Sequence, residues 1–256
     1  MQGEIVKIES NTATVKDHTG AFGATASANF TLTRDDNKLT VANGSLSGFT
    51  GKVNETTDTN HGLLFTVGND ETLAQTGMSI SDNEASDARG MIRVNGGMLT
   101  VEDSSFTGNA GVLGGALNLV KAEEGTKISN TTFSGNEAGS HGGAAYVTGG
   151  TVVFENVSFS GNKAGLQGGA LEIVGGEDVP TTVTLKDVTF SGNSSTMPQG
   201  ADKTNGFSGG AVMVNSAKTK LTGENVVFTG NKAETSNGGA LAVANGGEAS
   251  IVGGSF

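Results

Sequence analysis

Few residues in this sequence have the types and spacing that catalytic or metal chemistry requires. The three histidines, His18, His61 and His141, are far apart, and none belongs to an HxH or HExxH arrangement that would bind zinc. The chain has no cysteine, which excludes thiol catalysis, disulfide bonds and cysteine-ligated metals. We therefore expect neither a metal nor a cofactor.

Acidic side chains recur at one repeated position instead of gathering in one place. Cleavage of glycosidic bonds typically needs two carboxylates that converge on a single bond. Here Asp or Asn stands three residues before a phenylalanine in every copy of a repeated phrase, which is typical of a structural position. We predict no catalytic residue and no enzymatic activity. The five positions are Asp103, Asn130, Asn156, Asp187 and Asn225.

The repeated phrase is Phe-Ser/Thr-Gly-Asn, followed after a gap by Gly-Gly-Ala and an apolar stretch. Successive phenylalanines are 27, 26, 31 and 38 residues apart, and a period of this size is typical of a solenoid. The aromatic and amide positions are Phe106 and Asn109, Phe133 and Asn136, Phe159 and Asn162, Phe190 and Asn193, and Phe228 and Asn231. The triplets are Gly114, Gly115 and Ala116; Gly142, Gly143 and Ala144; Gly168, Gly169 and Ala170; Gly209, Gly210 and Ala211; and Gly238, Gly239 and Ala240.

The spacing of apolar residues around each phenylalanine indicates strands. Val152, Phe154 and Val157 precede Phe159 by seven, five and two residues, and a spacing of two is strand periodicity. The phase changes once, at the Asp or Asn, where a short polar side chain tolerates a left-handed backbone and allows a bend. A third alternating stretch follows Gly-Gly-Ala. Three short strands per coil of about 26–27 residues predict an all-β, right-handed parallel β-helix, or β-solenoid.

Stacked coils place equivalent side chains above one another. We predict an internal ladder of phenylalanine rings and a second ladder of asparagines, whose amides bond the neighbouring coil. The Gly-Gly pair is expected to form a tight corner with positive φ, followed by close approach of two backbones. The motif residues are therefore interpreted as scaffold, and outward side chains as the binding positions.

The copies divide the chain into regions. Residues 106–256 hold regular coils, and residues 39–105 hold degenerate coils in which Leu46 replaces the phenylalanine. Residues 1–38 match no copy and are predicted to cap the solenoid. No stretch has the features of a signal peptide or a membrane span, and the sequence stops at Phe256, where another phrase would begin. We expect a segment truncated at its C-terminal end from a longer protein.

Two sets of side chains are candidates for binding. Tyr146, Glu172 and Met213 belong to the column of the third strand that is expected to face outward, and Tyr146 is the only tyrosine. Met197 and Phe207 belong to the longest gap between Asn and Gly-Gly, which is compatible with either a solvated loop or a recognition loop. The net charge of −11 disfavours nucleic acid and anionic membranes as partners.

The paired Gly-Gly-Ala-[Leu/Val/Ala] and Phe-x-x-Asn phrases resemble the repeats of the chlamydial polymorphic outer membrane proteins. The resemblance is good over residues 80–256 and weak over 39–79. It implies the passenger region of an autotransporter, carried by type V secretion to the bacterial outer membrane and cell surface. It also implies an adhesin role in virulence, with a host-cell surface protein or glycan as the receptor. Those passengers usually contain cysteines, whereas this chain has none.

Two other functions are compatible with a β-helix. A polysaccharide-degrading enzyme would need an acidic cluster confined to one coil, which the sequence does not show. A structural or self-assembling surface stalk would associate through the exposed strand edges of a solenoid. An adhesin is the function that we predict.

Overall fold

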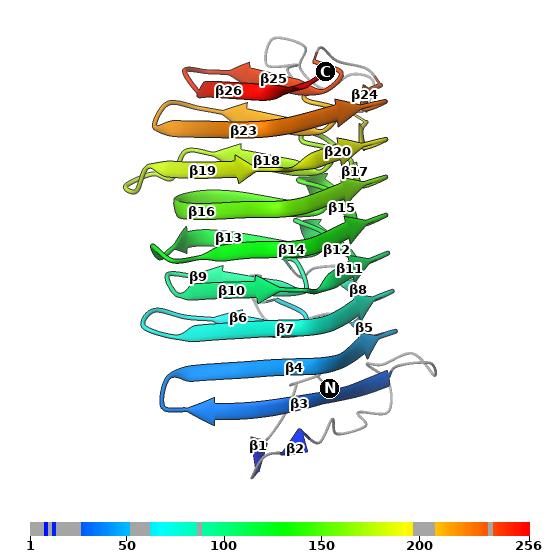
Figure 1. Cartoon of the computed structure of the whole chain (residues 1–256), viewed down its shortest axis with the longest axis vertical. Coiled ribbons are helices and arrows are strands. Elements are labelled where there is room, and N and C mark those ends of the chain that lie inside the picture. Colours follow the sequence, from blue (N-terminus) through cyan, green and yellow to red (C-terminus); the bar gives the residue numbers. More distant parts are fainter. Residues whose placement is uncertain are drawn as a thin grey trace.

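The chain forms a stack of β-coils (Figure 1). The structure is a computed structural model that describes residues 8–9, 12–13, 27–51, 62–85, 89–196, 208–234 and 238–256. These residues form strands and turns, and none of them is helical. The stack confirms the predicted all-β parallel solenoid.

A front ladder of parallel strands carries the apolar positions before the bend and the phenylalanines after it. It faces the viewer in Figure 1, and its neighbours pair in parallel throughout. Its strands are β4 (Lys38–Ser47), β7 (Thr72–Ser81), β10 (Met98–Glu102), β11 (Ser105–Thr107), β14 (Lys127–Ser134), β16 (Ala145–Ser160), β19 (Thr181–Lys186), β20 (Thr189–Ser191), β23 (Thr219–Thr229) and β26 (Glu248–Ser255).

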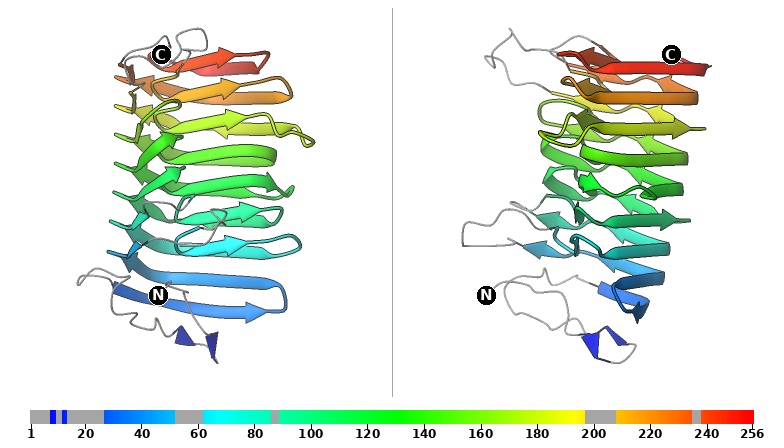
Figure 2. Two further views of the ribbon diagram at one scale, coloured as in Figure 1. Left: turned by 180° about the vertical axis from the view of Figure 1, so that it is seen from behind. Right: turned by 90° about the vertical axis from the view of Figure 1, so that its left-hand side faces the viewer.

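A back ladder holds the strands that follow Gly-Gly-Ala, and Figure 2 shows it from behind. All of its pairings are parallel. Its strands are β6 (Phe65–Val67), β9 (Ile92–Asn95), β13 (Leu117–Ala122), the first residues of β16, β18 (Leu171–Val174), β22 (Val212–Asn215) and β25 (Leu241–Ala244).

A side ladder of very short strands joins the front ladder to the back ladder. In the sequence this stretch is only the gap between Asn and Gly-Gly, because strands of two to five residues are too short to show periodicity. These strands also pair in parallel. They are β5 (Thr50–Gly51), β8 (Glu84–Ala85), β12 (Ala110–Leu113), β15 (Glu137–His141), β17 (Lys163–Ala164), β21 (Ser194–Ser195) and β24 (Lys232–Ala233).

The strands at the N-terminal side break the parallel order. Strand β3 (Ser27–Asp35) runs antiparallel to β4, and β1 (Ile8–Glu9) runs antiparallel to β2 (Thr12–Ala13). Strand β4 is the first strand of the parallel front ladder, and it begins at Lys38, one residue before the predicted start of the coils. The antiparallel strands β1, β2 and β3 therefore lie within residues 1–38, the predicted cap.

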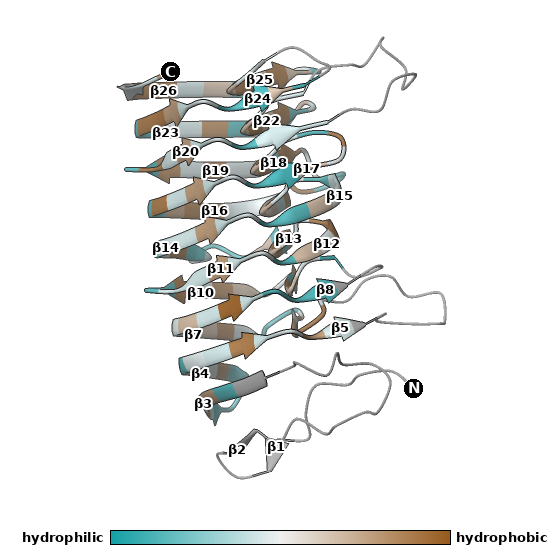
Figure 3. Cartoon of the chain, turned by 90° about the vertical axis from the view of Figure 1, so that its right-hand side faces the viewer, coloured by the Kyte–Doolittle hydropathy of each residue, from teal (hydrophilic) through white to brown (hydrophobic). Residues whose placement is uncertain are grey.

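The interior is filled by the predicted apolar positions. Hydrophobic and hydrophilic residues alternate along the strands in Figure 3. The rings of Phe106, Phe133, Phe159 and Phe190 are buried and stack at centroid distances of 4.9 Å, and the next ring, Phe228, lies 5.1 Å from Phe190. Burial of each ring contributes about 1.5–3 kcal/mol. The predicted internal aromatic ladder is confirmed.

The bend of each coil lies at the predicted polar residue. Asp103, Asn130, Asn156, Asp187 and Asn225 have φ values between 48° and 54°, in the left-handed region. Short side chains that accept hydrogen bonds are enriched in this conformation. The bend lets apolar residues on both sides of it, such as Phe154 and Val157, face the same core.

Candidate functional site

The asparagines of the repeated phrase form hydrogen bonds between coils inside the solenoid. Asn136 donates from Nδ2 to the carbonyl of Phe106 at 3.0 Å and to Oδ1 of Asn162 at 3.0 Å. Its own Oδ1 accepts from the backbone N–H of Asn109 at 3.1 Å. Asn109, Asn162 and Asn193 make equivalent bonds and are fully buried, so the predicted asparagine ladder is confirmed. These amides are not available to a ligand.

The Gly-Gly pair forms the predicted corner, as the copy in β15–β16 illustrates. Gly142 has a φ of 62°, and a Cβ there would lie 2.1 Å from the carbonyl oxygen of Ala145. A Cβ on Gly143 would lie 2.0 Å from the carbonyl oxygen of Gly169 in the next coil. Both positions therefore exclude any side chain. The triplets are buried in the copies that begin at Gly114, Gly142, Gly168 and Gly209, whereas Gly239 of the last copy is exposed.

The column predicted to face solvent is largely buried, so that part of the prediction is wrong. Glu172 and Met213 are 1% and 0% exposed, and Tyr146 is half-buried. Alternation correctly indicates that these side chains point away from the solenoid core. The alternation cannot show that the Gly-Gly corner brings the end of the side strand over this column of side chains. Asn118 of the same column, for example, donates to the carbonyl of Leu113 in β12.

This covered column is mostly polar. In the register of the back ladder, Arg93, Asn118, Tyr146 and Glu172 lie directly above one another. Arg93 donates from Nη1 to Oδ1 of Asn118. At the other end, Nδ1 of His141 in β15 lies 2.6 Å from Oε2 of Glu172 in β18. Among the described residues, Glu172 is the one acidic side chain that is buried.

The buried pair changes the proton affinities of its members. Burial raises the pKa of Glu172, and the His141 contact only partly offsets this. For His141, burial lowers the pKa, but the hydrogen bond and negative charge of Glu172 raise it overall. Burial and the charge of Glu172 raise the pKa of Tyr146 to about 12, against an opposing effect of Arg89. A single carboxylate with a histidine offers a proton-binding pair, not the two carboxylates of a glycosidase.

Sequence reasoning missed this pair because its members are 31 residues apart. The signal was present in the repeat itself. His141 is the residue before Gly-Gly in one coil, and Glu172 follows Gly-Gly-Ala by two residues in the next coil. Comparing these two positions across adjacent coils would have identified the contact. The other candidates, Met197 and Phe207, lie outside the described residues, as do His18 and His61.

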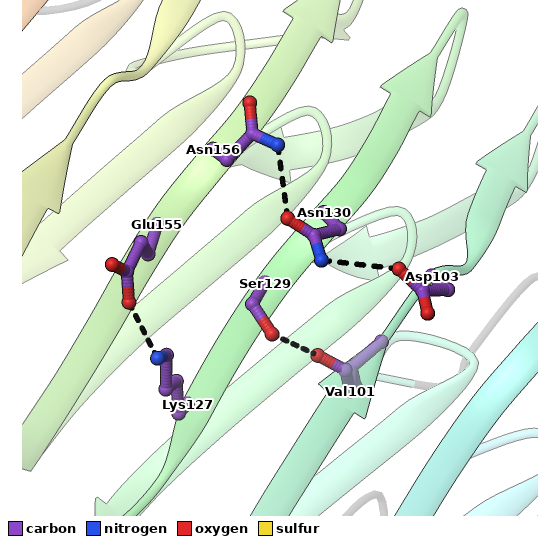
Figure 4. A network of polar contacts seen from close by, with 7 residues as sticks. All are labelled: Val101, Asp103, Lys127, Ser129, Asn130, Glu155 and Asn156. Atoms are coloured by element: carbon purple, nitrogen blue, oxygen red, sulfur yellow. Dashed lines mark hydrogen bonds and ion pairs between the residues drawn. The ribbon is translucent and has the colours of Figure 1, made fainter.

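The bend residues form an exposed ladder on the outside of the front ladder (Figure 4). Asn130 donates to Oδ1 of Asp103 at 3.1 Å, and Asn156 donates to Oδ1 of Asn130 at 2.9 Å. Beside them, Lys127 forms an exposed ion pair with Glu155. This surface is polar and regular, and its charges are accessible.

Next to the bend, the outer side of the strands that carry Phe106 and its equivalents presents two columns of residues that all bear a hydroxyl group except Val227, and we call them the hydroxyl face. The columns flank the buried phenylalanines on both sides, and their members are exposed or half-buried. One column is Ser45, Ser79, Ser105, Thr132, Ser158, Thr189, Val227 and Ser255, and the other is Ser47, Ser81, Thr107, Ser134, Ser160, Ser191 and Thr229. A shallow depression at its edge is lined by Ser79, Ser105, Asp103 and Asn130, among others.

The described residues contain no group of three or more His, Cys, Asp or Glu that could hold a metal ion. They also contain no helix long and apolar enough to cross a membrane. What the described surface offers is hydrogen-bonding and charged side chains on a rigid frame, which suits recognition of a partner.

Comparison with known proteins agrees with the repeat pattern. The family described as Chlamydia polymorphic membrane protein (Chlamydia_PMP) repeat matches residues 130–148, 156–173 and 225–244. The first two of these segments run from the bend through the Phe-x-x-Asn phrase to the back ladder. No curated protein and no solved structure matches the chain. The chain is a parallel β-solenoid in which three segments match the Chlamydia polymorphic membrane protein repeat.

Proposed function

We propose that this chain is the passenger segment of an autotransporter, displayed on a bacterial surface, and that it attaches the bacterium to host cells. The observation that carries the proposal is the family match in three coils, together with the inward position of the matched motif residues. The Phe rings of the motif are buried, and the Asn side chains are hydrogen-bonded between coils. The residues on the outer faces can therefore vary without loss of the fold and can contact a partner. The partner is a protein or glycan of the host-cell surface.

Attachment can be tested with the purified chain coupled to fluorescent beads and applied to cultured epithelial cells. Beads carrying the folded chain should attach, and beads carrying Phe159→Ala should not. Removing this central ring leaves a cavity that costs about 3–5 kcal/mol. Phe256→Ala is the matched control, because Phe256 ends the ladder and is 76% exposed. It should keep both folding and attachment.

Two outcomes would contradict the proposal. The first is that beads with the folded chain attach to no cell type. The second is that circular dichroism shows Phe159→Ala to be unfolded, and beads with this variant still attach as well as beads with the unchanged chain. Light scattering at rising concentration separately tests self-association, which is the behaviour expected of a stalk. Incubation with neutral and acidic polysaccharides, followed by an assay for reducing ends, tests for degradation.

A further inference from the structure

We propose that the hydroxyl face binds an uncharged polysaccharide that lies along the axis of the stack. This inference rests on the proposed attachment function, for which it names the class of ligand. The face belongs to the outer side of β11, β14, β16, β20 and β23, directly over the buried phenylalanine ladder. Its position is therefore set by the buried stack of phenylalanine rings.

The fold does not use these hydroxyl groups. The side-chain hydroxyls of Ser105, Ser134 and Ser160 make no hydrogen bond within the part of the chain that the structure describes. Ser104, one residue from Ser105, shows the contrast, since it is buried, donates to the carbonyl of Glu102 and accepts from the N–H of Met78. Serine is also not among the residues enriched in strands. Neither internal bonding nor strand propensity explains the serines of this face, and Val227 is the one residue of the two columns without a hydroxyl group.

The charge distribution favours a neutral ligand. The hydroxyl face contains no charged residue, whereas the column just before the bend contains Glu102, Glu155, Lys186 and Glu224 in register. With a net charge of −11, the chain repels anionic polymers. Hydroxyl groups both donate and accept hydrogen bonds, so they match the hydroxyl groups of a sugar.

The geometry suits a polymer better than a single small ligand. Levels of a parallel stack repeat every 4.8 Å or so, and alternate residues along a strand lie about 7 Å apart. An extended chain along the axis would meet a hydroxyl of the face at each level. Individually weak contacts of this kind add up through multivalency. The depression at Ser79 and Ser105 gives the chain a recessed place to contact the face.

The test measures binding of the purified chain to immobilised dextran, mannan and laminarin, and to heparin and hyaluronan as anionic polymers, with cell attachment measured in parallel. The variant S105A/S134A/S160A removes three hydroxyls from the face. The matched control T76A/T100A/T151A removes three half-buried hydroxyls from the front ladder before the bend. Both variants should melt like the unchanged chain. Binding to at least one neutral polymer should fall about tenfold or more in the first variant, because three hydrogen bonds are lost, and stay within about twofold in the control.

The inference is overturned if only heparin or hyaluronan binds, or if both triple variants lose binding equally. It is also overturned if cells are bound but no neutral polymer is, which leaves the attachment function standing and assigns the contact to a protein. Failure of cell attachment together with retained polymer binding would contradict the proposed function but not this inference.

Discussion

At the scale of single residues, the pair of His141 and Glu172 links two adjacent coils. His141 belongs to the side strand of one coil and Glu172 to the back strand of the next, and their side chains are 2.6 Å apart. Tyr146 lies over Glu172 in the column, and Arg89 acts on Tyr146 through its charge. The carboxylate is buried, so its protonation is tied to the folded state.

The stability contributed by this pair should fall as pH rises. The pKa of His141 is raised above 6.5 and that of Glu172 above 4.5, so the folded chain binds protons more tightly than the unfolded chain at both sites. The contribution is present below the unfolded values and is lost as pH rises through the folded values. We expect the melting temperature to decrease between pH 6 and 9, measured by circular dichroism in low-salt buffer.

Glu172→Gln keeps a hydrogen-bond acceptor for His141 but removes the titrating carboxyl group, and it should flatten that decrease. Glu155→Gln is the control, because Glu155 is exposed and its pKa is lowered by Lys127, away from this pH range. The explanation fails if Glu172→Gln shows the same pH dependence as the unchanged chain.

Gln75 is a second residue whose environment is unusual. It occupies an inward position of β7, in register with Val41 and Val101, and is 2% exposed. Neither its Nε2 nor its Oε1 has a hydrogen-bond partner in the described part of the chain. A buried amide without partners costs about 1–3 kcal/mol.

Replacing Gln75 by methionine should therefore stabilise the protein by about 1–3 kcal/mol, since the two side chains are similar in shape and the unpaired amide disappears. Chemical denaturation would measure the gain. Gln75→Glu should have the opposite effect, because it buries a charge. An unchanged or lowered stability of the methionine variant would mean that the amide is hydrogen-bonded, for example to a buried water molecule.

At the scale of the elements, the exposed ladder at the bends is interrupted. Asn130 and Asn156 each donate to the preceding coil, and so does Asn225, which donates to Oδ1 of Asp187 at 3.0 Å. A carboxylate at Asp187 has no hydrogen to donate to Oδ1 of Asn156. The ladder therefore ends at Asn156 and starts again at Asp187.

Asp187→Asn should complete the ladder and raise stability by about 0.5–1.5 kcal/mol, the usual net worth of one hydrogen bond. Asp103→Asn is a matched control. The preceding coil has Gly77 at this position, which offers no side-chain acceptor. Differential scanning calorimetry of both variants checks the prediction, and equal shifts in the two would refute it.

The elements also show what could be predicted from the sequence. The strands, the bend at Asn130 and the stacking of Phe133 follow from periods of two residues and of one coil, which are local properties that repeat. The burial of Tyr146 and Glu172 does not follow, because it depends on how the corner holds the end of β15 against the back ladder. The corner at Gly142 and Gly143 can be predicted because the pair recurs in each regular coil, but the alternation of apolar and polar residues does not show the direction in which the chain turns there. The binding roles of Met197 and Phe207 remain predictions.

At the scale of the whole molecule, the internal ladders do not extend evenly along the stack. Phenylalanine rings stack from Phe106 to Phe256, whereas the equivalent positions of earlier coils hold Leu46 and Ile80. The unpaired Gln75 also lies in the earlier coils. In a solenoid, each coil is stabilised by its own residues and by its neighbours. The coils of β4 and β7 should therefore be weaker than those that follow.

Hydrogen exchange followed by mass spectrometry tests this gradient. Amides of β7 should exchange faster than those of β23, although β7 lies further than β23 from the nearer end of the stack. Local unfolding free energies govern this exchange. If distance from the ends alone decided stability, β23 would exchange at least as fast as β7.

The long gap between Asn193 and Gly209 leaves the stack undisturbed. Phe190 and Phe228 are 38 residues apart in sequence, yet their rings are separated by the same distance as rings 26 residues apart, within a few tenths of an ångström. The hydroxyl groups of Ser195 and Ser208 meet at 2.6 Å and close the gap at its base. A foreign peptide inserted between these two serines would begin and end at neighbouring points on the protein surface. The chain is therefore suited to the display of epitopes on a rigid carrier.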